Sequence, residues 1–345
     1  MFKRFDLLLV LSLFVLLLIS TIVLRSIAPS IYPLYFVYFI IAVVAFIFFS
    51  QLDFDIISLF SKHLYIGSIV LLLVTLIIGK VTRGVIRWIP IGALTIQSAE
   101  LVRPFLLLYY ANQLTKDRLT ANRLIRIIIM FLIPFGLILI QPSLGVAILF
   151  LAGFIGVLLS SGIKKSYFLW LVLFAIIFVP VSWQFLKPYQ KARIITFVDP
   201  FKDPLGRGYN AIQSIISVGS GRFFGRGLGK GVQTQLAFLP ERQTDFIFAA
   251  ISEELGFVGA GMVLSGLFLI LWRLTVFMER AISPAARAYL AGFFLMLFFQ
   301  ALIHIGMNMG LLPITGVPLP LISAGGSSLL ATMIGLGIAL GARKS

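Results

Sequence analysis

Five charged side chains lie close together in an otherwise apolar chain. Glu241, Arg242 and Asp245 occupy a polar segment that leads directly into an apolar run, and that run also holds Glu253 and Glu254. Ionised carboxylates at a membrane boundary cost free energy unless they are paired, hydrated or used. The spacing therefore indicates the edge of an active site.

Asp245 is the carboxylate placed best for chemistry. It follows Thr244, a residue type that favours helix N-caps, and it opens the apolar run. One interpretation is an ordinary acidic residue in the first turn of a helix, where the helix dipole favours negative charge. The other is a general base at the boundary between water and lipid. Spacing alone leaves both open.

Glu253 and Glu254 are expected about 12 Å further along the same helix, at 1.5 Å per residue. At least one of them is expected to face the interior of a helix bundle. There it would pair with a basic residue, hold a divalent cation, or join helices without any role in chemistry.

A second polar group consists of Gln97, Glu100 and Arg103. Their spacing of three residues predicts one helix with all three side chains on the same face. A buried Glu–Arg pair is one interpretation, and the lining of a substrate cavity is the other.

Arg83, Arg87 and Trp88 follow the third apolar run. Such residues are common membrane-interface anchors. Guanidinium groups also bind pyrophosphate in a bidentate manner, so a grip on a lipid pyrophosphate is the alternative.

Residues 219–231 are rich in glycine but carry no nucleotide-binding signature, since they lack the P-loop and dinucleotide patterns. Their backbone amides, together with Arg222, Arg226 and Lys230, would suit another anion. The alternative is a flexible, solvated loop.

Residues 310–328 contain three prolines and break the helical pattern, which predicts a re-entrant or cavity-lining turn.

Composition places the chain in a membrane. Of its 345 residues 60% are hydrophobic and the mean hydropathy is +1.08, far above soluble domains. It has no cysteine and two histidines, so neither a thiolate site nor a zinc site is expected, and no haem site is predicted. The net charge of +16 is dispersed, which argues against nucleic acid.

The apolar runs predict an all-α, polytopic membrane protein. Ten spans are expected, at 6–24, 31–50, 63–80, 97–113, 124–140, 144–161, 167–185, 245–274, 286–309 and 323–341. Basic residues collect in alternate short loops, which predicts that both termini are cytoplasmic. Residues 1–345 then form a single transmembrane domain, and residues 186–244 form one large extracytoplasmic loop within it.

The polar segments together resemble the SEDS family (shape, elongation, division and sporulation), and its RodA branch more than its FtsW branch. The resemblance runs from the first span to the last. The motifs that carry it are Arg87-Trp88-Ile89, Gln97-Ser98-Ala99-Glu100, Gln141-Pro142-Ser143-Leu144-Gly145, Phe197-Val198-Asp199-Pro200, Gly208-Tyr209-Asn210, Gln213-Ser214, Leu239-Pro240-Glu241-Arg242-Gln243-Thr244-Asp245-Phe246 and Leu312-Pro313 through Gly325-Gly326-Ser327-Ser328.

The chain departs from the family pattern at several positions. Arg103 stands where a lysine is usual, Ser143 replaces an acid, Gln243 replaces a histidine, and Ala324 replaces a tyrosine. Because Asp245, Glu100, Glu253 and Glu254 remain, an active member of the family is expected.

The resemblance implies a peptidoglycan glycosyltransferase of the bacterial inner membrane, with its active site on the extracytoplasmic side. It implies polymerisation of lipid II onto a nascent glycan strand, together with a class B penicillin-binding protein and the elongation machinery, for rod shape. Asp245 falls on the family's essential acid, and Mg²⁺ or Mn²⁺ is a candidate cofactor. Substrate contacts are expected at Arg87, Glu100, Arg103, Arg193, Arg207, Glu241, Arg242, Glu253, Glu254, Ser327 and Ser328.

Three other functions remain open on the sequence. A lipid II flippase also needs charged residues within the membrane, although it would place them through its whole depth. An FtsW-type polymerase of the division machinery is the second, and a scaffold that only recruits partners is the third.

Overall fold

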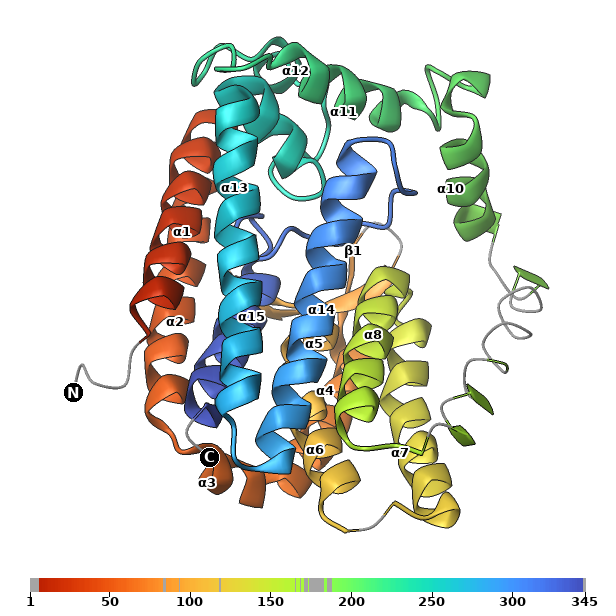
Figure 1. Ribbon diagram of the computed structural model, residues 1–345. Helices are drawn as coiled ribbons and strands as arrows, with labels where there is room; N and C mark the ends of the chain where they lie inside the picture. Colours follow the sequence, from red (N-terminus) through yellow and green to blue (C-terminus); the bar gives the residue numbers. More distant parts are fainter. Residues whose placement is uncertain are drawn as a thin grey trace.

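The computed structural model describes residues 6–82, 85–92, 94–117, 119–164, 166–167, 169–170, 173, 183–184 and 188–343, and these form a helical bundle (Figure 1). Within these described ranges, six helices are long and apolar enough to cross a membrane, and two shorter apolar helices accompany them. The six are α1 (Leu7–Ile27), α2 (Tyr32–Gln51), α4 (Ser61–Ile78), α7 (Ala121–Ile140), α13 (Ile247–Arg280) and α14 (Pro284–Asn308). The two shorter ones are α8 (Leu144–Ser160) and α15 (Gly326–Ala342).

Eight of the ten expected spans therefore correspond to helices of this multi-pass membrane protein. The fourth expected span is divided into α5 (Ser98–Leu101) and α6 (Arg103–Thr115). The seventh, at 167–185, falls mostly outside the described residues. Between α2 and α4 lies the short helix α3 (Phe54–Leu59).

Close helix contacts in the centre of the bundle depend on glycine residues, which have no side chain. A Cβ atom on Gly156 of α8 would lie 2.6 Å from the carbonyl oxygen of Ala291 on α14, and one on Gly292 would lie 2.8 Å from that of Gly153. The backbones of α8 and α14 thus touch directly, as small residues allow in membrane bundles.

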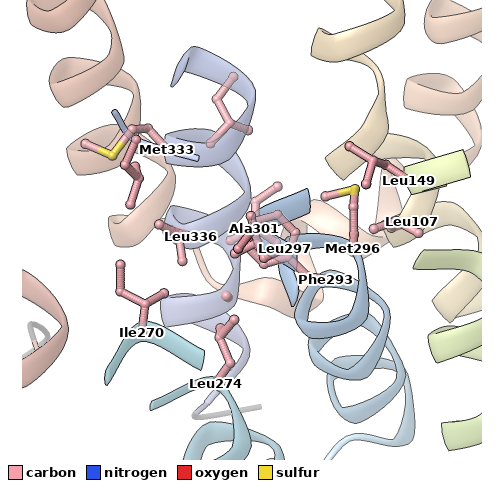
Figure 2. Close-up of a cluster of buried hydrophobic side chains, with 14 of the residues drawn as sticks. Leu107, Leu149, Ile270, Leu274, Phe293, Met296, Leu297, Ala301, Met333 and Leu336 are labelled. Carbon is pink, nitrogen blue, oxygen red and sulfur yellow. The ribbon is translucent and has the colours of Figure 1, made fainter. Parts of the chain in front are cut away.

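Apolar side chains fill the space around α14. Figure 2 shows Leu107, Leu149 and Met296 meeting between α6, α8 and α14, and all three are buried. The buried Phe293 ring faces α15 instead, since a Cβ atom on Gly335 would lie 2.1 Å from it. On the other side of α14, Leu336 of α15 belongs to the same cluster. The middle of the bundle is therefore an apolar core.

One end of the bundle joins the beginning and end of the described chain. Asp6 receives hydrogen bonds from Arg273 of α13 at 3.0 and 2.5 Å and lies 3.6 Å from a guanidinium nitrogen of Arg343, which follows α15. The two chain ends thus lie at the same end of the bundle, while α11 and α12 lie at the other (Figure 1).

The segment after α4 forms a small sheet that was not predicted from the sequence. Strands β1 (Lys80–Thr82), β2 (Val85–Ile91) and β3 (Leu94–Ile96) pair antiparallel in that order. The Tyr38 hydroxyl of α2 holds this sheet, since it donates to the Thr95 carbonyl at 2.7 Å.

The expected large loop contains short helices. They are α10 (Pro188–Val198), the 3-10 turn η2 (Pro200–Lys202), α11 (Tyr209–Ser220) and α12 (Val232–Gln235). In Figure 1, α11 and α12 lie across the end of the bundle above α13, whereas α10 lies at the edge.

Candidate functional site

Asp245 lies in a turn, not in a helix. Helix α13 begins at Ile247 with Phe246 as its N-cap, so the prediction that Thr244 caps the helix was wrong. The N–H groups of Thr244 and Phe246 donate to the Glu241 carbonyl at 3.0 and 3.2 Å, and these two hydrogen bonds close the turn just before α13 begins. The Thr244 hydroxyl bonds the Glu241 carboxylate at 3.1 Å instead of an α13 amide.

Three successive carbonyls of this turn are fixed by other parts of the chain. The Gln243 carbonyl accepts the Ala324 N–H at 2.9 Å, and the Thr244 carbonyl accepts the Ser323 hydroxyl at 2.8 Å. The Asp245 carbonyl accepts the side-chain amide of Asn308 at 3.0 Å. The backbone that carries the Asp245 carboxylate is therefore held from two directions.

Asn308, at the end of α14, joins several elements. Its amide also donates to the His304 carbonyl at 2.8 Å, and its side-chain oxygen accepts the Ala249 N–H of α13 at 3.0 Å. That N–H belongs to the first turn of α13, where amides lack a partner within the helix. Asn308 was not among the predicted site residues, although a polar side chain within an apolar, membrane-spanning helix is itself a signal of a functional role.

The non-helical segment 309–325 lies beside this turn, and its place between α14 and α15 is as expected. The Val317 carbonyl of this segment lies 2.7 Å from the His304 ring nitrogen. A Cβ atom on Gly316 would lie 3.6 Å from the Asp245 carboxylate, so that carboxylate faces the segment. A Cβ on Gly145 would lie 3.3 Å from the Thr315 carbonyl, which places the start of α8 against the same segment.

Glu100 and Arg103 form a buried ion pair, with exposures of 2% and 1%. They do not share one helix with Gln97 as predicted, because α5 ends at Leu101, α6 begins at Arg103 and Gln97 is only the N-cap of α5. The Arg103 guanidinium also donates to the Gln300 side chain of α14 at 3.3 Å.

Ser327 and Ser328 are buried in the first turn of α15. The Ser327 hydroxyl accepts the Gln97 N–H at 2.8 Å, and the Ser328 hydroxyl accepts the Gln300 amide at 3.2 Å. Both serines therefore join helices, as the Glu100–Arg103 pair does. The interpretation of these four residues as a buried structural network fits their contacts better than direct substrate binding.

Glu253 and Glu254 are fully buried in α13 but face the loop. Glu253 accepts the N–H groups of Gln233 and Thr234 at 2.9 and 3.0 Å, at the start of α12. Glu254 accepts the Ser26 hydroxyl and the Gln235 amide, both at 2.8 Å. All four carboxylate oxygens accept hydrogen bonds, so the pair anchors the loop to α13. A role of either glutamate in binding a divalent cation or substrate stays a prediction.

The glycine-rich stretch completes a break in α13. Gly256 has φ +66° and ψ −159°, which interrupts the helical hydrogen bonds. The N–H groups of Arg226 and Gly227 donate to the Glu253 and Glu254 carbonyls at 2.9 and 3.0 Å. These two amides are thus occupied within the fold, which fixes the stretch on α13 and does not fit a flexible loop. Binding of an anion by the exposed side chains of Arg222, Arg226 and Lys230 stays a prediction.

The basic candidates are spread over several elements. Arg242 lies in the Asp245 turn, where its Nε donates to the Ile27 carbonyl of α1 at 3.0 Å. Arg87 lies on β2, 6.0 Å from the Trp88 ring. Arg193 and Arg207 are exposed on the loop, and α10, which carries Arg193, stands apart from α13 (Figure 1). Of these four, only Arg242 shares the turn of Asp245.

A family comparison accounts for this set of motifs. The model of the FtsW, RodA and SpoVE group, described as cell cycle proteins, matches residues 1–345. The chain belongs to this family. It is 38% identical to the peptidoglycan glycosyltransferase MrdB of Escherichia coli over 284 residues, covering 81% of this chain and 76% of that protein. It is also 38% identical over 287 residues to a probable peptidoglycan glycosyltransferase FtsW of Pseudoalteromonas translucida, covering 81% and 72%.

Solved structures of the FtsW, RodA and SpoVE group have the same architecture. A chain from a peptidoglycan synthase complex that coordinates polymerization and crosslinking superposes with a TM-score of 0.85 at 31% identity, over 99% of this chain and 98% of that one. The rod shape determining protein RodA of Thermus thermophilus superposes with a TM-score of 0.75 at 28% identity, over 99% and 97%.

Three further departures from the family pattern have structural partners here. Ser143 accepts the Gln97 side-chain amide at 3.3 Å, so a hydroxyl serves as the acceptor at that position. Gln243 and Ala324 meet through their backbones, a contact that does not depend on either side chain.

Proposed function

We propose that this member of the FtsW, RodA and SpoVE family polymerises lipid II into glycan strands with Asp245 as the general base. The chain is a peptidoglycan glycosyltransferase. The observation that carries the assignment of Asp245 is the fixation of its turn, in which Ala324, Ser323 and Asn308 hold three successive carbonyls. Such preorganisation is what a base needs when attack and proton transfer occur together.

The reaction joins two lipid-linked sugars. The 4-hydroxyl of the GlcNAc in lipid II attacks the anomeric carbon of the terminal MurNAc of the growing strand. As that C–O bond forms, the bond to undecaprenyl pyrophosphate breaks, the configuration inverts from α to β, and the hydroxyl proton passes to the Asp245 carboxylate. Because a carboxylate is a far weaker base than an alkoxide, the proton leaves only as the new bond forms.

The pyrophosphate must be neutralised as it departs. Arg242, in the turn of Asp245, is the nearest of the candidates along the chain, and Arg87, Arg193 and Arg207 lie on the sheet and the loop at that end. If Mg²⁺ or Mn²⁺ takes part, Asp245 and Glu241 are the carboxylates that this turn offers, and no step above depends on such an ion.

The membrane placement follows the charge pattern. We place the protein in the bacterial inner membrane with Asp6 and Arg343 at the cytoplasmic face and Asp245 at the extracytoplasmic face, where lipid II is polymerised. A crosslinking partner of the class B penicillin-binding type and the elongation machinery are the partners of this proposal. The synthase complex that superposes on this chain supports the first of them.

The apolar middle of the bundle favours a polymerase over a flippase. Leu107, Phe293 and Met296 fill the space between the two ends, where a flippase must pass a charged, sugar-bearing headgroup. The carboxylates near Asp245 lie instead at one end of the bundle.

Polymerisation of purified lipid II, resolved on a gel, tests the proposal. The protein, alone and with its class B partner, is expected to give long glycan strands. Translocation of lipid II in liposomes without any polymer under either condition would contradict the polymerase and support the flippase.

A further inference from the structure

Aromatic side chains of the glycine-rich stretch form an exposed group at the outer end of α13. The Phe223 ring stacks on that of Phe257, with centroids 5.8 Å apart, and the Phe224 ring meets Phe223 edge-on at 4.8 Å. Phe224 and Phe257 are 78% and 66% exposed. The contacts that fix Glu253 and Glu254 hold this stretch in place, so the three rings are presented by an anchored turn.

The same group continues a lipid-facing stripe of α13. Exposed Phe257, Leu264, Phe268 and Trp272 recur at helical spacing along one face. From Phe257 to Arg280 the helix rises about 35 Å at 1.5 Å per residue, and the hydrocarbon core is about 30 Å thick. With Arg280 at one membrane surface, Phe257 lies at the other.

Exposed basic side chains surround the rings. Arg222, Arg226 and Lys230 are exposed on the stretch itself. Exposed Arg25 lies at the end of α1, next to Ser26, which binds Glu254. The two glutamates are buried and accept hydrogen bonds from the loop, so the surface of this corner is positively charged.

We propose that this corner, defined by Arg25, Arg222, Phe223, Phe224, Arg226, Lys230 and Phe257, is a membrane-binding anchor for anionic phospholipid in the outer leaflet. The rings enter the boundary between headgroups and acyl chains, and the basic groups contact lipid phosphates. This fixes the height of the loop above the membrane, and it does not depend on the catalytic role of Asp245.

Spin labelling tests the anchor directly because the chain has no cysteine. Phe224→Cys carries a nitroxide label in nanodiscs of equal parts phosphatidylcholine and phosphatidylglycerol. The measured quantity is the oxygen-to-nickel ratio, which is the accessibility of the label to oxygen divided by its accessibility to a water-soluble nickel complex. The ratio at position 224 is compared with the ratios at two reference positions. Phe268→Cys on the lipid-facing stripe is the membrane reference. The water reference is Leu236→Cys, at the exposed residue that directly follows α12, a helix at the outermost end of the bundle in Figure 1.

The label at 224 is expected to show an oxygen-to-nickel ratio several-fold above that at 236 and close to that at 268. A ratio equal to that at 236 would overturn the anchor. A label that becomes shielded only when a partner chain is added would also overturn it and would assign the corner to protein docking.

Lipid composition tests the basic residues. In phosphatidylcholine alone, the ratio at 224 is expected to fall, and in the double variant Arg222→Gln/Arg226→Gln it is expected to be the same in both bilayers. Lys202→Gln, an exposed lysine on η2, is the matched control and retains the difference. If the ratio at 224 is the same in both bilayers while Arg222 and Arg226 are intact, the role of anionic lipid in the proposal is contradicted.

Discussion

The side-chain amide of Asn308 donates to the backbone carbonyl of Asp245 at 3.0 Å, across 63 positions of sequence. The same side chain accepts the Ala249 N–H. One residue at the end of α14 thus fixes both the turn that carries the carboxylate and the first turn of α13. It is a positioning residue in this account, because it acts on substrate only through Asp245.

Asn308→Asp is expected to reduce the kcat of lipid II polymerisation about tenfold or more with little change in KM. The carboxylate keeps the acceptor for Ala249 but loses the donor to Asp245, and an unsatisfied buried carbonyl costs about 1–3 kcal/mol. A factor of ten in rate corresponds to about 1.4 kcal/mol.

Ser214→Ala is the matched control for Asn308. It removes a hydroxyl that donates to the Asn308 backbone carbonyl at 2.8 Å and leaves the side-chain amide in place. Equal kcat losses in both variants would mean that Asn308 acts through general stability and not through Asp245.

Glu253→Ala is expected to release the loop over α12. Two buried N–H groups, of Gln233 and Thr234, would lose their acceptor, at about 1–3 kcal/mol each. A lower melting temperature and faster proteolysis within residues 222–236 are the expected readouts. Glu279→Ala, at an exposed position of the same helix, should change neither, and the same behaviour of both variants would argue against the anchor role of Glu253.

Gly256→Ala is expected to destabilise the protein strongly. A Cβ atom there would lie 2.2 Å from the Gly225 nitrogen, at a φ of +66° that favours glycine. Gly261→Ala, with no neighbouring atom within 4 Å, is the control and should be neutral or stabilising by up to about 1 kcal/mol. Similar melting temperatures for the two variants would show that the break in α13 can be removed without penalty.

Asp6 gives a pH dependence at the other end of the bundle. Burial raises the pKa of Asp6, but hydrogen bonds from Arg273 and the Leu9 N–H, with the charges of Arg273 and Arg343, outweigh it and hold the pKa below its ordinary value of 3.8. A depressed pKa means that the pairing stabilises the fold above that ordinary value. The stabilisation is lost as the pH falls through the lower, folded-state pKa.

Asp6→Asn is therefore expected to lower the melting temperature at pH 7. The difference from the unsubstituted protein should shrink as the pH falls below the ordinary pKa of 3.8. A difference that stays constant from pH 7 to pH 3 would show that Asp6 acts as a helix cap through Leu9 and not through charge.

The sequence predicted the helices because apolar run length reports directly on membrane spanning. Asp245 was predicted as the general base because charge is rare in such a chain, and that role stays a prediction. The sheet at β1–β3 was missed although Val85, Ile86, Ile89 and Ile91 are typical strand residues, since Arg87 and Trp88 drew the interpretation towards an interface anchor.

The partners of the carboxylates could not be predicted from the sequence. Glu253 binds amides 20 and 19 positions away, and those contacts exist only after the loop folds back on α13. The break at Gly256 has the same origin, since its unpaired groups are satisfied by Arg226 and Gly227. Local spacing contains no information on contacts of this kind.

The most direct test of the central claim compares Asp245→Asn with Glu241→Gln and the unsubstituted protein in polymerisation of purified lipid II with the class B partner. Glu241→Gln keeps an acceptor for Thr244 and serves as the matched control in the same turn. The account predicts long strands from the unsubstituted protein and from Glu241→Gln, and none from Asp245→Asn at an unchanged melting temperature. Strands from Asp245→Asn would contradict it and would move the base to another carboxylate.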